Sequence, residues 1–148
     1  MAAALTNFLR RLRQDDRGAM VVEFALLAPA FLLLVLGVLY TGISLQNYNA
    51  IRNLSADVAR YAVIQQQSGN NLSNSQLRTY AIGRAQGAPY LLRTSQFNAT
   101  VVDAADQRIA GVRELEVNVT YQVDNMLEFA GIPALFLTFE RPVFLAED

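Results

Sequence analysis

The longest apolar segment of the sequence runs from Phe24 to Leu45. Its 22 residues carry no charge, and as a helix rising about 1.5 Å per residue they would extend about 33 Å, enough to cross a hydrocarbon core of roughly 30 Å. Large apolar side chains occur on every side of such a helix, which is typical of a segment surrounded by lipid. The pattern therefore predicts a transmembrane helix over residues 24–45, in preference to a buried helix of a soluble protein.

Beyond Leu45 the pattern becomes one-sided, and no helix-breaking residue stands before Ser68. Apolar side chains recur there at three- and four-residue spacing while polar side chains occupy the opposite face, which is typical of an amphipathic helix. The sequence thus predicts one helix over residues 19–67, whose second half supports a folded domain. A coiled coil is the alternative for that half, although two heptads are too few to specify one alone. The apolar positions are Tyr48, Ile51, Leu54, Val58, Tyr61 and Val63 or Ile64.

A polar segment over residues 65–75 predicts the turn that ends this helix. Ser73, followed three residues later by Gln76, has the spacing of a capping box. We therefore expect a second, short helix over residues 74–86, closed at Gly87.

The remaining residues alternate between apolar and polar, which is typical of strands. We expect strands over residues 97–102, 113–123 and 135–145, a hairpin turn over residues 103–106, and an edge position or a break at Pro142. One face of the central strand would pack on the long helix, since neither element is stable with its apolar side in water. The predicted fold class is therefore α+β, with a long N-terminal helix packed against a small domain that contains a short helix and an antiparallel sheet. The inward face consists of Leu115, Val117, Val119, Tyr121 and Val123.

The apolar segment from Met126 to Phe139 has two interpretations. Glu128 interrupts it, and the uncharged residues that follow are too few to span a bilayer as a helix. It either packs in the core or between subunits, or contacts the membrane interface.

Charges around the apolar run predict its orientation. Arg10, Arg11, Arg13 and Arg17 precede the run, whereas the first charge after it is Arg52. An excess of arginine marks the cytoplasmic side, so we expect a cytoplasmic N-terminus and a periplasmic domain over residues 68–148. A cleaved secretory signal also begins with basic residues, but its apolar core has only about 7 to 15 residues. The run over residues 24–45 is too long for such a signal.

Composition excludes several classes of function. The chain has no histidine and no cysteine, which removes serine–histidine triads, thiol nucleophiles and the usual zinc sites. It has no phosphate-binding glycine loop and no basic patch for nucleic acid. The pair Glu114 and Glu116 could do acid–base chemistry in a small membrane-tethered enzyme, but we expect these side chains on a solvated face. We expect no catalytic residue, cofactor, metal or small-molecule substrate.

Glu23 is unusual because it stands at the start of the apolar run. A carboxylate at the centre of a membrane helix costs about 2.5–3.5 kcal/mol on insertion scales, and less near an interface. One interpretation is a carboxylate that reaches back to water. The other requires a cut between Gly18 and Ala19, because the new amino group of Ala19 would then lie one helical turn from Glu23, in its own chain or in a neighbouring one.

Residues 14–45 resemble the TadE-like pseudopilins of tight adherence (Flp) pili, which are relatives of type IV pilins. The family pattern is a short basic leader, a glycine, a cleavage site and an apolar helix with glutamate five residues into the mature chain. Gly18, Ala19, Glu23 and the aromatic Phe24 match it in that order. The resemblance implies a leader over residues 1–18, a pilin-like fold, and roles for Gly18 and Ala19 in processing and for Glu23 and Phe24 in subunit interaction. The leader itself would be either a short amphipathic helix on the inner membrane surface or a disordered basic tail.

The resemblance also implies a function and partners. We expect a minor pilin-like subunit that a prepilin peptidase processes in the inner membrane and that later reaches the pilus. Its partners would be sister pseudopilins, the major pilin, the inner-membrane assembly platform and membrane lipid. The alternative is an uncleaved bitopic anchor or sensor with a periplasmic protein-binding domain.

Overall fold

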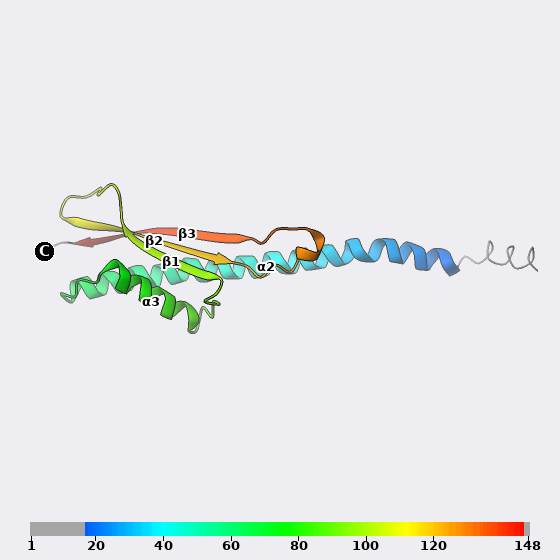
Figure 1. Ribbon diagram of the computed structural model, residues 1–148, viewed down its shortest axis with the longest axis horizontal. Coiled ribbons are helices and arrows are strands. Elements are labelled where there is room, and N and C mark those ends of the chain that lie inside the picture. The colour runs from blue at the N-terminus through cyan, green and yellow to red at the C-terminus, as the bar shows by residue number, and fades with distance from the viewer. Residues whose placement is uncertain (1–16, 147–148) are drawn as a thin grey trace, which may run out of the picture. The chain divides into compact units, whose positions relative to one another are not determined.

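The computed structural model describes residues 17–146, so most of the predicted leader, with either interpretation of it, lies outside the described residues. The elements in chain order are α2 (Arg17–Gln67), α3 (Asn74–Gln86), β1 (Phe97–Asp103), β2 (Val112–Gln122), the 3₁₀ helix η1 (Glu128–Ala130) and β3 (Phe136–Ala146) (Figure 1). Both predicted helices and all three predicted strands are confirmed. The chain divides into two compact units between Leu39 and Tyr40, and helix α2 contributes to both.

The first unit contains the apolar part of α2. Within the part of the chain that the structure describes, α2 is the one helix long and apolar enough to cross a membrane. Its most apolar window has no buried residue. Phe24, Leu26 and Phe31, for example, expose 72%, 75% and 66% of their surfaces. Side chains of this type need a cover of lipid or of other apolar helices.

The second unit is built on a three-stranded antiparallel sheet in the order β1-β2-β3. The register pairs Val101 with Val117 and Val117 with Arg141, so odd-numbered residues of all three strands share one face. The odd-numbered residues of β2 from Leu115 to Tyr121 are buried, as predicted. Strand β3 lies at a sheet edge, the position in which Pro142 costs no ladder hydrogen bond.

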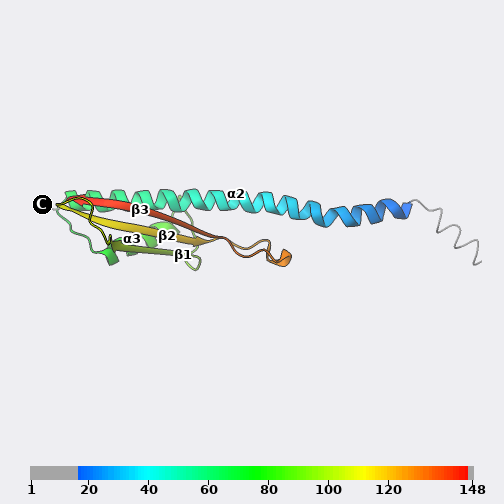
Figure 2. The same cartoon turned by 90° about the horizontal axis from the view of Figure 1, so that it is seen from above.

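The second half of α2 runs alongside the sheet (Figure 2). It covers the odd-numbered face, where the ring of Tyr48 lies 6.1 Å from that of Phe139. Ile51, Leu54 and Val58 are completely buried. The Arg141 Nε donates to Ser55 Oγ over 3.1 Å, which joins β3 to the same stretch of helix. The sheet thus occupies the apolar helix face that a coiled coil would require.

Helix α3 completes the core on the side of β1. Its capping box is present as predicted: the Gln76 N–H donates to Ser73 Oγ and the Ser73 N–H donates to Gln76 Oε1. Leu77 and Ala81 are fully buried. The Arg78 Nε donates to the Ala99 carbonyl over 2.9 Å, which fastens α3 to β1. Leu77, Ala81 and Ala85 form its buried face.

The connection between β1 and β2 differs from the predicted turn over residues 103–106, because it continues to Gly111. Gly111 has φ +75°, a left-handed conformation that favours glycine. Within the connection, Gln107 Nε2 donates to the carbonyl of Glu114 over 3.1 Å and Gln107 Oε1 accepts from the Glu114 N–H over 2.7 Å. Side-chain bonds of this kind extend the loop beyond the predicted four-residue turn.

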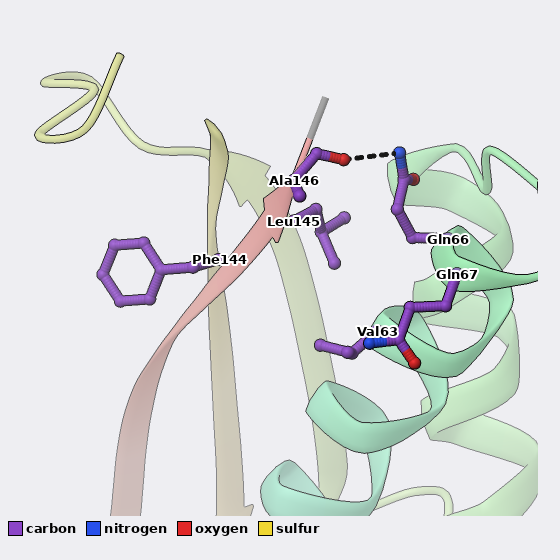
Figure 3. Close-up of a pocket in the computed structure, with 6 residues that line it drawn as sticks. All are labelled: Val63, Gln66, Gln67, Phe144, Leu145 and Ala146. Carbon is purple, nitrogen blue, oxygen red and sulfur yellow. Dashed lines mark hydrogen bonds between the residues drawn. The ribbon is translucent and has the colours of Figure 1, made fainter. Parts of the chain in front are cut away.

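Strand β3 is fastened to α2 near both of its ends. Beside its first residue, the Leu135 N–H donates to Tyr40 Oη over 3.1 Å. At its last residue, Gln66 Nε2 donates to the Ala146 carbonyl over 3.0 Å (Figure 3). Since Tyr40 and Gln66 are 26 positions apart, the two attachments are separated by roughly 39 Å of helix.

Candidate processing and assembly site

All four residues of the expected site lie in the first two turns of α2. Ala19 and Glu23 are four positions apart, so the helix places them one above the other on the same side. Ala19, Glu23 and Phe24 are exposed. The structure therefore places Ala19 and Glu23 one helical turn apart, and the pairing of their charged groups stays a prediction.

The fold of the described residues does not require glycine at position 18. Gly18 lies in a regular helix, and a Cβ placed on it would meet no atom within 4 Å. Glycine also weakens a helix by about 1 kcal/mol relative to alanine, so residues 17–19 can unwind more easily than their neighbours. Any requirement for a small residue at position 18 must come from a molecule outside the described chain.

The side chain of Glu23 has no hydrogen-bond or ion-pair partner among residues 17–146. The nearby Met20, Val22 and Leu27 are exposed and apolar. In lipid, a carboxylate in such surroundings needs either water at the interface or a cation from another group. The amino group at residue 19, once free, would supply that cation.

The other carboxylate singled out from the sequence has a different environment from the one expected. Glu114 is only 2% exposed, so the expectation of a solvated side chain is wrong for this residue. The loop after β1 lies over it: Arg108 Nε donates to Glu114 Oε1 over 2.8 Å and to Oε2 over 3.1 Å. These hydrogen bonds hold the pKa of the Glu114 carboxyl below its ordinary value, although burial alone would raise it. Glu114 is thus kept ionised by a structural ion pair, a poor state for a general acid.

A second titratable cluster joins α2 to the segment after α3. The Tyr90 hydroxyl donates to Asp57 Oδ2 over 2.7 Å, and Arg84 Nε lies 3.7 Å from the same oxygen. Burial and then this hydrogen bond raise the pKa of Tyr90 to about 12. A tyrosine that ionises so late serves packing better than acid–base chemistry. Among residues 17–146, no three potential metal-binding side chains come together.

The hollow at the far end of the sheet is small. Its volume is about 170 Å³, below the roughly 300 Å³ of a typical small-molecule site. Figure 3 shows Leu145 directed towards the helix and Phe144 directed away from it. The lining carries amide and apolar groups but no ionisable side chain, and consists of Val63, Gln66, Gln67, Phe144, Leu145 and Ala146. This hollow offers no chemistry beyond packing.

Two residues with informative contacts were missed by the sequence analysis. Arg108 gave no signal, because a lone arginine in a loop has no recognisable pattern. Tyr40 gave a weak sequence signal, since tyrosine near the end of an apolar run is typical of the membrane interface. Only the structure shows that its hydroxyl holds Leu135, 95 positions away.

An exposed apolar helix joined to a small α+β domain defines a pilin-like architecture, compatible with a single-pass membrane protein. The family described as TadE-like protein matches residues 18–60, a stretch that begins at Gly18 and includes Ala19, Glu23 and Phe24. Over these residues the chain is similar to the TadE-like family, which agrees with the resemblance inferred from the sequence. The match links these residues to a family of the tight adherence pilus. No curated protein and no solved structure matched the chain.

Proposed function

We propose that this protein is a minor pilin-like subunit of a tight adherence pilus, acting in pilus initiation, assembly or tip formation. The observation that carries the proposal is where the family match begins and which structural features lie within it. The match begins at Gly18, at the base of the apolar part of α2, whose most apolar window has no buried residue. Glu23 is the sole acidic residue between Gly18 and Ala56. A processing site, an assembly carboxylate and an uncovered helix stand in the order that a pilin subunit requires.

In this proposal the chain enters the inner membrane with its N-terminus in the cytoplasm and its domain in the periplasm. A prepilin peptidase removes residues 1–18. The remaining chain, comprising the helix over residues 19–67 and the domain over residues 68–148, is then drawn from lipid into contact with sister pseudopilins, the major pilin and the assembly platform. The exposed apolar surface of α2 supports this transfer, because helices can replace lipid around it without burying a new polar group.

Cleavage and assembly are linked through the amino group of Ala19. Before the cut, the nitrogen of Ala19 is an uncharged amide and offers Glu23 no cation. After the cut it is an ammonium group, and in a low-dielectric environment opposite charges attract strongly. A neighbouring subunit's ammonium can then pair with Glu23, while Phe24 packs beside the pair.

The mature N-terminus tests the proposal. The full chain is produced in cells with and without the prepilin peptidase, and its intact mass is measured after purification from membranes. With the peptidase, the protein should begin at Ala19 and be lighter by roughly 2 kDa, the mass of a short leader of this length. A chain that still begins at Met1 in the presence of the peptidase contradicts the proposal and favours the uncleaved anchor or sensor.

Two glycine variants sharpen this test. Gly18→Val places a branched side chain beside the bond to be cut, so the leader should remain attached. Gly37→Val is the matched control, since both positions lie in α2 and a Cβ at either meets no atom within 4 Å. The control should be processed like the unmodified protein. Equal processing of both variants would remove Gly18 from the proposed site.

A further inference from the structure

The segment between β2 and β3 exposes large apolar side chains on a short, ordered loop. We name residues 126–135 the apolar loop. Phe129 exposes 70% of its surface, Ile132 42% and Leu135 40%, and Phe136, directly after the loop, 66%. A group of exposed apolar side chains of this size marks a surface that contacts a protein or a membrane.

The conformation of the apolar loop is fixed from within. Leu127 exposes only 5% of its surface, and its N–H donates to Asn125 Oδ1 over 3.2 Å. Asn125 Nδ2 donates to the Ile132 carbonyl over 2.9 Å, across the loop. Gly131 has φ +74° and closes η1 in the left-handed conformation that glycine adopts most easily. With Leu127 held inside, Phe129 is presented outwards at little further cost in conformational entropy.

The apolar loop is attached to the last part of the predicted membrane segment. The Leu135 N–H donates to Tyr40 Oη over 3.1 Å. A groove of about 400 Å³ continues this attachment along the helix to Tyr48. Its lining is mostly apolar and consists of Tyr40, Thr41, Ser44, Leu45, Tyr48, Leu135 and Leu137. Residues of the loop and residues of the apolar run therefore form one continuous surface within the second unit.

The position of Tyr40 on α2 sets the depth of the apolar loop relative to the bilayer. A helix that leaves the cytoplasmic interface near Glu23 crosses a hydrocarbon core of roughly 30 Å in about 20 residues, which ends between Tyr40 and Leu45. Tyrosine is enriched at that level, where its ring meets acyl chains and its hydroxyl meets polar groups. The opposite end of the sheet, with the loop over residues 104–111, is roughly 34 Å away along the 11 residues of β2 (Figure 1).

We propose that the apolar loop is a second membrane contact, which inserts Phe129 and Ile132 into the periplasmic interface of the bilayer that α2 crosses. The proposal rests on the membrane anchoring in the proposed function. The occupant is lipid, because the loop is continuous with the end of the apolar run that the proposed function places in the bilayer. Insertion is hydrophobic and not electrostatic, since residues 126–135 contain Glu128 and no basic residue.

Tryptophan fluorescence provides the test, because the chain contains no tryptophan. Phe129→Trp places one reporter on the apolar loop. Ile109→Trp is the matched control: Ile109 is also an exposed apolar loop residue, at 51%, but at the opposite end of the sheet. Phe31→Trp reports whether α2 itself is in the bilayer. Each full-length variant is reconstituted in vesicles of phosphatidylethanolamine and phosphatidylglycerol, with or without bromine on the acyl chains, which quenches nearby tryptophan.

The expected result is loss of emission by brominated lipid for Phe31→Trp and Phe129→Trp, a blue shift for both, and no change for Ile109→Trp. Quenching of Phe31→Trp without quenching of Phe129→Trp overturns the loop contact and leaves the membrane anchor intact. A blue shift of Phe129→Trp that brominated lipid does not quench also overturns it, and assigns the loop to a protein partner. Absence of quenching at Phe31 overturns the membrane anchoring and the loop contact together.

Discussion

At the scale of single residues, the pair of Arg108 and Glu114 shows how a buried carboxylate is stabilised by hydrogen bonds from a neighbouring loop. Glu114 belongs to the central strand, yet the loop over residues 104–111 covers it almost completely. Both carboxylate oxygens accept hydrogen bonds from Arg108, and Oε2 also accepts from the Arg108 N–H over 3.3 Å. A buried charge with this many donors remains ionised and ties the loop to the sheet.

The ion pair predicts a pH dependence of stability. The folded pKa of Glu114 is lowered from 4.5, so its contribution is complete above about pH 4.5 and is lost as the pH falls through the lower folded value. Glu114→Gln should therefore be less stable than the unmodified protein at neutral pH, and the difference should narrow below about pH 4.5. Denaturant unfolding in detergent micelles between pH 3 and pH 7 measures it. A difference that stays constant over this range would mean that the pair does not titrate as the geometry indicates.

Val119 and Thr120 offer a direct test of strand register. Val119 is completely buried, whereas the side chain of Thr120 lies on the opposite face and is partly exposed. Val119→Lys places an unpaired ion in the core and should reduce the free energy of unfolding by several kcal/mol. Thr120→Lys should change it by no more than about 0.5 kcal/mol. Equal losses in denaturant unfolding would show that the register of β2 is wrong.

At the scale of elements, α3 depends on its N-terminus because it is short. A helix of 13 residues is marginal in water, so caps and tertiary contacts decide whether it forms. The capping box satisfies free N–H groups of the first turn, and Leu77 secures the next turn in the core. The stacked rings of Tyr61 and Tyr80, 3.8 Å between centroids, join α3 to α2.

Removing the cap should destabilise the domain measurably. Ser73→Ala deletes the oxygen that accepts from the Gln76 N–H, at an expected cost of about 1 kcal/mol. Asn71→Ala is the control, since Asn71 is exposed in the segment before α3 and outside the capping box. Thermal unfolding followed by circular dichroism compares the two variants. If both melt at the same temperature as the unmodified protein, the cap contributes nothing to the stability of the domain.

The elements that the sequence predicted well are those fixed by local patterns. Helix α3 follows from Ser73 and Gln76, and the buried face of β2 follows from strict alternation. The features that the sequence predicted poorly depend on residues that are distant in the chain. Alternation alone puts Glu114 in solvent, since it cannot show that a loop returns over it. The contact of Leu135 with Tyr40 joins residues 95 positions apart, beyond the reach of any local pattern.

For the candidate site, the order of residues was predictable and the partner was not. Gly18, Ala19 and Glu23 stand in a short motif, and the helix places the last two on one side as expected. In the proposed function, the partner of the Glu23 carboxylate depends on a second molecule and on a cut in the chain, and the fold of one subunit encodes neither.

At the scale of the whole molecule, the surfaces that stabilise the domain differ from the surface that we propose for assembly. The domain has no cysteine, so packing of the sheet on two helices replaces a disulfide staple. The apolar part of α2 contributes no buried side chain in its most apolar window. We therefore expect that substitutions in that part can change assembly without unfolding the domain. The role of Glu23 can then be tested by mutation.

Glu23→Val should separate cleavage from assembly. The variant removes the cost of a carboxylate in lipid, so the subunit should insert stably. The leader should still be removed, because the proposed cut lies between Gly18 and Ala19, four residues before the substitution. It should fail to join its partners, because the ammonium group of a neighbouring Ala19 would lack a counter-charge in a low-dielectric environment. Glu23→Gln should be intermediate, since it keeps hydrogen bonding without the charge.

Co-purification of each variant with sister pilins from membranes measures assembly, and a blot for the leader measures cleavage in the same samples. Phe24→Leu is a useful companion, because Phe24 is exposed beside Glu23 and its replacement alters packing while leaving every charge in place. Loss of partners in Glu23→Val but not in Phe24→Leu would assign the interaction to charge pairing. A cleaved Glu23→Val subunit that assembles as well as the unmodified protein would make the carboxylate a bystander, and the pairing of Glu23 with Ala19 would have to be abandoned.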